Sequence, residues 1–167
     1  MFKRFWSKLQ GKRKAPGPRV GEAVAEILRA LPDNTIIRNG YPCPLGTIGH
    51  VVVSKHHGIF LVEVARIRGE VTVVQGDILV NNEPLAEDLV EQALKKSLWL
   101  KDELKQRTGV EAWINPLIVF LHAYVRSSLP IQGVRVVSLK YLKETIMKHR
   151  ATEDSMAVWL ALENAQL

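Results

Sequence analysis

The stretch that most constrains the fold is GIFLVEVARI, which begins at Gly58 and is apolar on both parities from Ile59 to Val64, apart from Glu63. Successive side chains of a strand point to opposite faces, so this run predicts a central strand covered on both sides. An ionised carboxylate there is costly unless it lies at a solvated strand end, pairs with a cation or binds a metal. Because Arg66 lies on the other parity, it is not the obvious partner of Glu63.

The segments around this strand predict a mixed sheet flanked by helices. We expect helices in GEAVAEILRAL from residue 21, in a long stretch that Pro84 opens and Gly109 ends, in KYLKETIMKHR, and in SMAVWLALENAQL. The remaining strands are expected in TIIRN, GTIGHVVVS, EVTVVQGDILVNN, INPLIVFLH and GVRVVSL. This order indicates an α/β protein, more closely an α+β mixed sheet. We expect Trp99, Trp113 and Trp159 in the core, with Leu160 docked beside Trp159.

Positive charge is concentrated at the start of the chain. The net charge is +6, and residues 1–19 hold seven basic side chains and no acid, leaving 16 basic and 17 acidic side chains elsewhere. The basic side chains are Lys3, Arg4, Lys8, Lys12, Arg13, Lys14 and Arg19. We therefore divide the chain into a basic tail and linker (1–19), a main domain (20–150) and a C-terminal helix packing on it (151–167).

Three interpretations of the tail stay open. Phe2, Phe5, Trp6 and Leu9 recur at roughly helical spacing between the basic residues, before the helix-breaking sequence APGP. The tail is a solvated disordered segment, an arm that binds nucleic acid, or an anchor on an anionic membrane surface. With one cysteine, Cys43, and no apolar run long enough to cross a bilayer, we expect a cytoplasmic protein, with peripheral membrane attachment as the alternative.

Four pieces of sequence together resemble a known family. They are the Gly-Glu pair at residues 21–22, GTIGHVVVSKHHGIFLVEV, GEV from Gly69, and Gln92 within the long helix. Their order and spacing are similar to the nuclease-related domain (NERD), a branch of the PD-(D/E)XK nuclease-like superfamily. The resemblance covers residues 21 to about 141 and implies a restriction-endonuclease-like core.

The resemblance also implies a catalytic site, two of whose four functional groups are missing from this sequence. In the family, carboxylates hold Mg²⁺ against a phosphate oxygen, and a lysine helps to orient the attacking water. Glu22 and Glu63 match the carboxylates, and Gln92 matches the helix glutamine. Gly49 stands where the family has aspartate, and Ala65 stands where it has lysine.

These replacements predict a degenerate site with no metal and no cofactor. The leading hypothesis is a catalytically inactive protein that binds nucleic acid through the six tail residues Lys3, Arg4, Lys8, Lys12, Arg13 and Lys14, together with Arg66 and Arg68 after the central strand. One alternative is an active nuclease that uses Mg²⁺ or Mn²⁺ in a remodelled site, with a cation supplied by Arg66, Arg68, Lys95 or Lys96. The other is an adaptor held at a membrane by the tail.

The histidines are expected to be structural rather than metal ligands. His50 begins the apolar sequence HVVV and is interpreted as a hydrogen-bonded residue. His56 and His57 lie in the turn-like sequence KHHG and are interpreted as solvated surface groups.

Overall fold

The computed structural model describes residues 20–32, 34–125 and 129–165, so the predictions for residues 1–19 lie outside the described residues. The helices are α2 (Val20–Arg29), α3 (Leu89–Thr108), the 3-10 helix η1 (Leu139–Tyr141), α4 (Leu142–Lys148) and α5 (Glu153–Asn164). The strands are β1 (Thr35–Cys43), β2 (Gly46–Ser54), β3 (Gly58–Val74), β4 (Asp77–Val80), β5 (Glu83–Pro84), β6 (Ile114–Val125), β7 (Leu129–Ile131) and β8 (Val134–Ser138).

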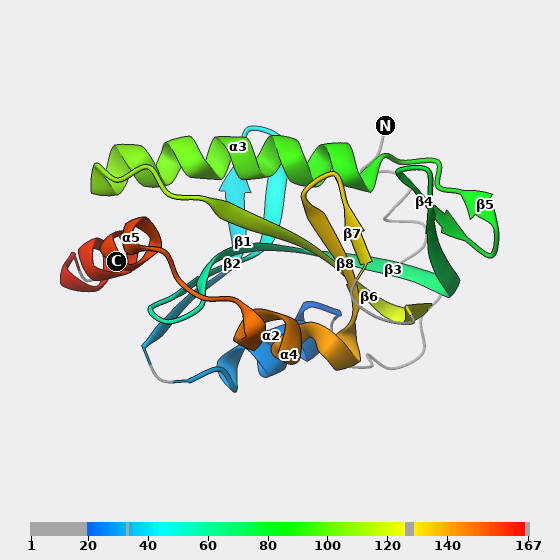
Figure 1. Ribbon diagram of the computed structural model, residues 1–167, viewed down its shortest axis with the longest axis horizontal. Helices are drawn as coiled ribbons and strands as arrows, with labels where there is room; N and C mark the ends of the chain where they lie inside the picture. The colour runs from blue at the N-terminus through cyan, green and yellow to red at the C-terminus, as the bar shows by residue number, and fades with distance from the viewer. Residues whose placement is uncertain (1–19, 33, 126–128, 166–167) are drawn as a thin grey trace, which may run out of the picture.

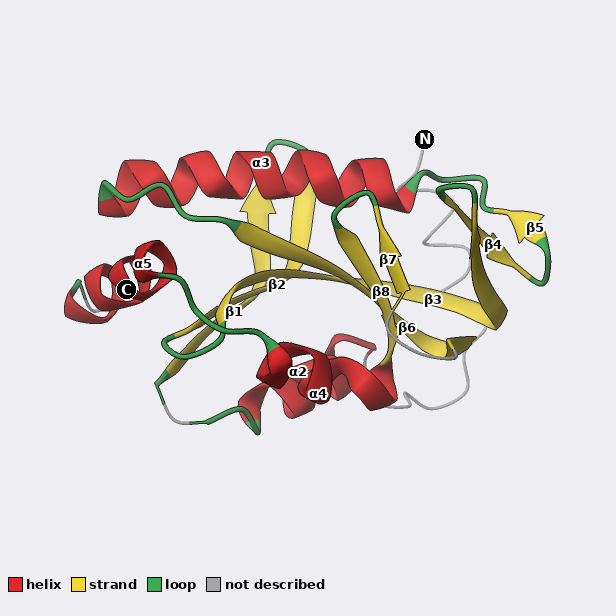
Figure 2. Ribbon diagram, in the orientation of Figure 1, coloured by secondary structure: helices red, strands yellow, loops and turns green. Residues whose placement is uncertain are grey.

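The predicted class is confirmed, because a mixed sheet of eight strands lies between helices (Figures 1 and 2). The main strand order is β1-β2-β3-β6-β8-β7, with β4 and β5 attached beside β3. The first three strands pair antiparallel, whereas β3, β6 and β8 run parallel. Strand β3 is the central strand that its apolar run predicts. Its first part pairs with β2, and its last part pairs with β4.

Helices cover both faces of the sheet. Helix α3 lies along one face, with α5 beside it, and α2 and α4 lie on the other (Figure 1). Leu61 of β3 is buried with residues of α3 and α5, whereas its neighbour Phe60 is buried against α2 and α4. A further buried cluster joins the first half of α3 to Ala65, β4, β6 and β8. The α3 face therefore carries two apolar clusters along the length of β3.

Helix α3 begins later than the sequence predicts. Pro84 pairs with Leu79 as part of β5, and the helix starts at Leu89, where the side chain of Asp88 accepts a hydrogen bond from the backbone N–H of Glu91. The predicted end is confirmed, because Gly109 adopts a left-handed conformation with φ of 75° and caps the helix. No helix among the described residues has the length and apolar character needed to span a membrane.

The predictions for the core aromatic residues hold in part. Trp159 of α5 is buried, and its indole N–H donates to the carbonyl oxygen of Asn34. Trp99 is half-buried against the core. The predictions for Trp113 and Leu160 are wrong, because both side chains are more than half exposed. The last helix instead turns Val158, Trp159 and Leu162 inward.

Candidate functional site

Glu63 lies in the middle of the sheet and faces α3. It shares a parity with Ile59 and Leu61, which belong to one apolar cluster, and with Ala65, which belongs to the other. Its neighbour on β6, Ile118, is buried. The carboxylate therefore lies at the junction of the two clusters, and about a quarter of its side chain remains exposed (24%). A solvated strand end does not describe this position.

A lysine of α3 pairs with this carboxylate. The Nζ atom of Lys96 lies 3.3 Å from Oε2 of Glu63, and the Lys96 side chain is only 12% exposed. The same ammonium donates to the carbonyl oxygen of Thr47 on β2 at 2.8 Å. Lys95 instead points outward and pairs with Glu91. Of the cations considered for a remodelled site, Lys96 is the one that the structure pairs with Glu63.

The second carboxylate oxygen is also engaged. The backbone N–H of Gly49 donates to Oε1 of Glu63 at 3.3 Å. Burial raises the pKa of Glu63 above its ordinary value, while Lys96 and the Gly49 N–H act in the opposite direction. We call Thr47, Gly49, Glu63 and Lys96 the Glu63 cluster. It ties β2, β3 and α3 together with one ion pair and two hydrogen bonds to the backbone.

Gly49 leaves no room for the family aspartate. A Cβ atom added at this position would lie 2.7 Å from the carbonyl oxygen of Val62, closer than real Cβ atoms approach backbone oxygen. The neighbouring His50 pairs directly with Val62 in the β2–β3 ladder. The loss of the aspartate is therefore accompanied by a close approach of β2 and β3, and an aspartate would require the backbone to move.

The Glu63 cluster does not suit Mg²⁺. Hard oxygen ligands are what Mg²⁺ requires, and both oxygens of Glu63 already accept from protein donors. The Lys96 ammonium, 3.3 Å from the Glu63 carboxylate, would also repel a divalent cation bound to that carboxylate. Within residues 20–32, 34–125 and 129–165, no three His, Cys, Asp or Glu side chains come together as a cation site.

The other site residues expected from the resemblance lie in several places. Glu22 is exposed in the first turn of α2, on the opposite face of the sheet from α3. Gln92 is exposed on α3, one turn before Lys96, and Ala65 is buried in the core. Arg66 and Arg68 are exposed on β3, where the pairing with β6 shifts register. The six tail residues lie outside the described part of the chain.

The histidines follow the structural interpretation in most respects. His50 is buried, and its Nδ1 lies 2.7 Å from the side-chain oxygen of Asn39. Burial lowers the pKa of His50, which favours the neutral ring. His56 is exposed as expected. His57 is only half exposed, because its Nδ1 lies 2.9 Å from the carbonyl oxygen of His149.

The protein is a mixed α/β domain consistent with a nuclease-like core, and its central strand carries an acidic residue. The family model of the nuclease-related domain (NERD) matches residues 17–121. The chain therefore belongs to the NERD family. Comparison with curated proteins and with solved structures found no match.

Proposed function

We propose that this protein is a nuclease-related module that binds nucleic acid without hydrolysing it. The observation that carries the proposal is the engagement of both Glu63 oxygens, one by Lys96 and one by the backbone of Gly49. A carboxylate that would hold a metal in an active relative instead joins a helix to two strands. Nucleic-acid binding needs positive charge and a fitting shape but no Lewis acid, so loss of the metal site leaves binding intact.

The distribution of charge over the fold supports the binding part of the proposal. Two hollows beside α4 contain basic side chains and no acidic ones in their linings. Arg135 and Lys148 line one, where Lys148 also pairs with Glu144 at 2.7 Å, and Lys140 and Lys143 line the other. Arg66 and Arg68 add exposed cations on β3, and residues 10–19 of the tail add four more basic side chains. Such contacts give affinity that is independent of sequence and sensitive to salt.

The test combines binding and cleavage in the same samples. Labelled single- and double-stranded DNA and RNA are incubated with Mg²⁺ or Mn²⁺ and with wild-type protein or Glu63→Gln. We expect no cleavage by either protein and binding that weakens as salt rises. A double variant, Arg66→Gln with Arg68→Gln, should weaken binding more than Lys95→Gln with Lys105→Gln. The second pair removes the same charge from exposed positions of α3.

The result that overturns the proposal is divalent-dependent cleavage that disappears in Glu63→Gln. Absence of binding at low salt also overturns it, and would favour the membrane or adaptor interpretation of the tail. An active remodelled nuclease is the second candidate, because Lys96 brings a lysine to the carboxylate that the family pairs with one. If the protein is such a nuclease, the wild type cleaves nucleic acid with Mg²⁺ or Mn²⁺, and both Lys96→Met and Glu63→Gln abolish the cleavage.

A further inference from the structure

An apolar hollow lies between α3, the start of β6 and the turn that joins β7 to β8. Its volume is about 240 Å³, and it is lined mainly by carbon, with Leu98, Trp113 and Pro116 among its walls. Leu98 is 66% exposed and Trp113 is 65% exposed. Large apolar side chains this exposed and this close together are typical of a surface that another segment covers.

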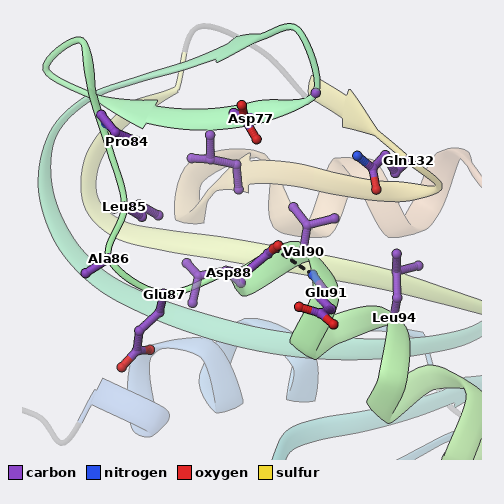
Figure 3. Close-up of a pocket in the computed structure, with 13 residues that line it drawn as sticks. Asp77, Pro84, Leu85, Ala86, Glu87, Asp88, Val90, Glu91, Leu94 and Gln132 are labelled. Carbon is purple, nitrogen blue, oxygen red and sulfur yellow. Dashed lines mark hydrogen bonds between the residues drawn. The ribbon is translucent and has the colours of Figure 1, made fainter.

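This hollow continues into a larger one with acidic walls. The second hollow has a volume of about 510 Å³ and shares Leu94 and Gln132 with the first. Figure 3 shows Asp77 of β4 on one side and the start of α3, with Asp88 and Glu91, on the other. We call the two hollows together the α3 groove.

The acidic end of the α3 groove is only partly neutralised. Asp88 caps α3, and Glu91 pairs with Lys95 across one helical turn. Asp77 and Glu87, which also line the hollow, form no ion pair with the described residues. From Asp88 to Leu98 the helix rises roughly 15 Å at 1.5 Å per residue. The groove thus offers negative charge at one end and apolar side chains at the other.

We propose that the α3 groove binds the N-terminal segment of the same chain, residues 1–9. The segment has the complementary chemistry, since its four large apolar residues are interspersed with three basic ones. The apolar residues are Phe2, Phe5, Trp6 and Leu9, and the basic ones are Lys3, Arg4 and Lys8. Its apolar side chains cover Leu98 and Trp113, and its cations approach Asp77 and Glu87. Residues 10–19 connect this segment to α2, and ten residues span at most roughly 33–36 Å when extended. Helical layers on opposite faces of one sheet lie roughly 20 Å apart, taking about 10 Å for each packed layer, so the linker is longer than that separation.

Limited proteolysis of the full chain tests this docking without nucleic acid, so its outcome is independent of the proposed function. Trypsin cleaves after Arg4 and Lys8, and mass spectrometry gives the initial rate at each site. A synthetic peptide of residues 1–14 provides the rate for an undocked segment. We expect wild-type protein to be cleaved at least tenfold more slowly than the peptide.

Matched variants locate the docking surface. Leu98→Glu should return cleavage to the rate of the free peptide, because it places a charge in the apolar part of the groove. Leu160→Glu is the control, since it makes the same change at a 54% exposed position on α5 and should leave the rate unchanged. A double variant, Asp77→Asn with Glu87→Gln, should also accelerate cleavage, because it removes two negative charges from the acidic hollow. It leaves the apolar hollow unchanged. Thermal melting of each variant checks that the fold is retained.

Three outcomes overturn the proposal. The first is cleavage of wild-type protein as fast as the free peptide. The second is protection that Leu98→Glu leaves intact, or that Leu160→Glu removes equally, because the segment would then lie elsewhere. The third is protection that grows with protein concentration together with a dimer in light scattering, because the groove would then hold the segment of a second copy.

Discussion

Replacing Lys96 with methionine tests whether the Glu63 cluster holds the helix to the sheet. Methionine keeps most of the length of the lysine side chain and has a similar helix propensity, so the change removes the ammonium with little effect on α3 itself. Glu63 would keep its hydrogen bond from the Gly49 backbone at 3.3 Å but lose its cation. The carboxylate would then lie beside apolar clusters without a neutralising charge.

The expected cost follows from the burial of the pair. Removing one partner of a fully buried ion pair costs about 3–5 kcal/mol. Glu63 keeps 24% exposure and one backbone donor, so we expect a smaller loss, about 2 kcal/mol. For a chain of 167 residues, that loss lowers the melting temperature by about 4–8 °C. Chemical denaturation with urea measures the free energy directly.

The loss should depend on pH in a definite direction. Burial raises the pKa of Glu63 above its ordinary value of 4.5, so the folded protein binds this proton more tightly than the unfolded chain. The contribution of Glu63 to the free energy of unfolding is therefore most favourable below pH 4.5, and it falls as the pH rises through the raised pKa. Lys96→Met raises the pKa of Glu63 further. The difference between wild type and variant should therefore be larger at pH 7.5 than at pH 5, because lowering the pH protonates a larger share of Glu63 in the variant than in the wild type.

Lys95→Met is the matched control, because Lys95 is exposed and contributes only an i,i+4 pair with Glu91, worth about 0.2–0.5 kcal/mol. If both variants unfold at the same urea concentration at both pH values, the Lys96–Glu63 pair contributes no more to stability than an exposed pair on α3. A double-mutant cycle with Glu63→Gln completes the experiment. We expect the two changes together to cost less than the sum of the single changes.

Two further predictions concern Gly49 and α5. Gly49→Asp, which restores the family aspartate, should destabilise the protein by about 1–3 kcal/mol, because its Cβ meets the Val62 carbonyl oxygen at 2.7 Å. It should gain no cleavage activity; a melting temperature that rises with Mg²⁺ in this variant would contradict us. Thr152→Ala should cost about 1 kcal/mol, because the Thr152 side chain accepts from the Ser155 backbone in the capping box of α5. Hydrogen exchange should accelerate across α5, and unchanged exchange would argue against the cap.

The sequence predicts the central elements because their signals are local. The apolar run on both parities is sufficient to identify β3, and Gly109 marks the end of α3. The start of that helix is misplaced because a proline commonly opens a helix, whereas here Pro84 pairs in a short strand and Asp88 provides the cap. Trp113 lies in the segment after α3, where no periodicity tells whether a side chain turns inward.

The candidate site is less accessible to sequence reasoning, because its partners come from different elements. Neighbouring residues of a helix point about 100° apart, so whether Lys95 or Lys96 reaches Glu63 depends on the rotation of α3 over the sheet. The sequence itself does not distinguish them, because they are adjacent lysines in ALKKSL. The close approach that excludes a side chain at Gly49 depends on the distance between β2 and β3. Lys96 also donates to the backbone carbonyl of Thr47, and because every residue has such a carbonyl, the sequence cannot identify this partner.

The parallel pairing of β3 with β6 has a consequence for how the chain folds. Ile59 pairs with Ile114, about 55 positions away, and all of α3 lies between the two strands. The β2–β3 hairpin and the β3–β4 hairpin each close a short loop and can form early. The β3–β6 ladder requires a much longer loop to close. Folding should therefore be limited by the arrival of β6, at the slower rates of domains with many non-local contacts. Until then β3 has an open edge, which makes the partly folded chain prone to association with other strands.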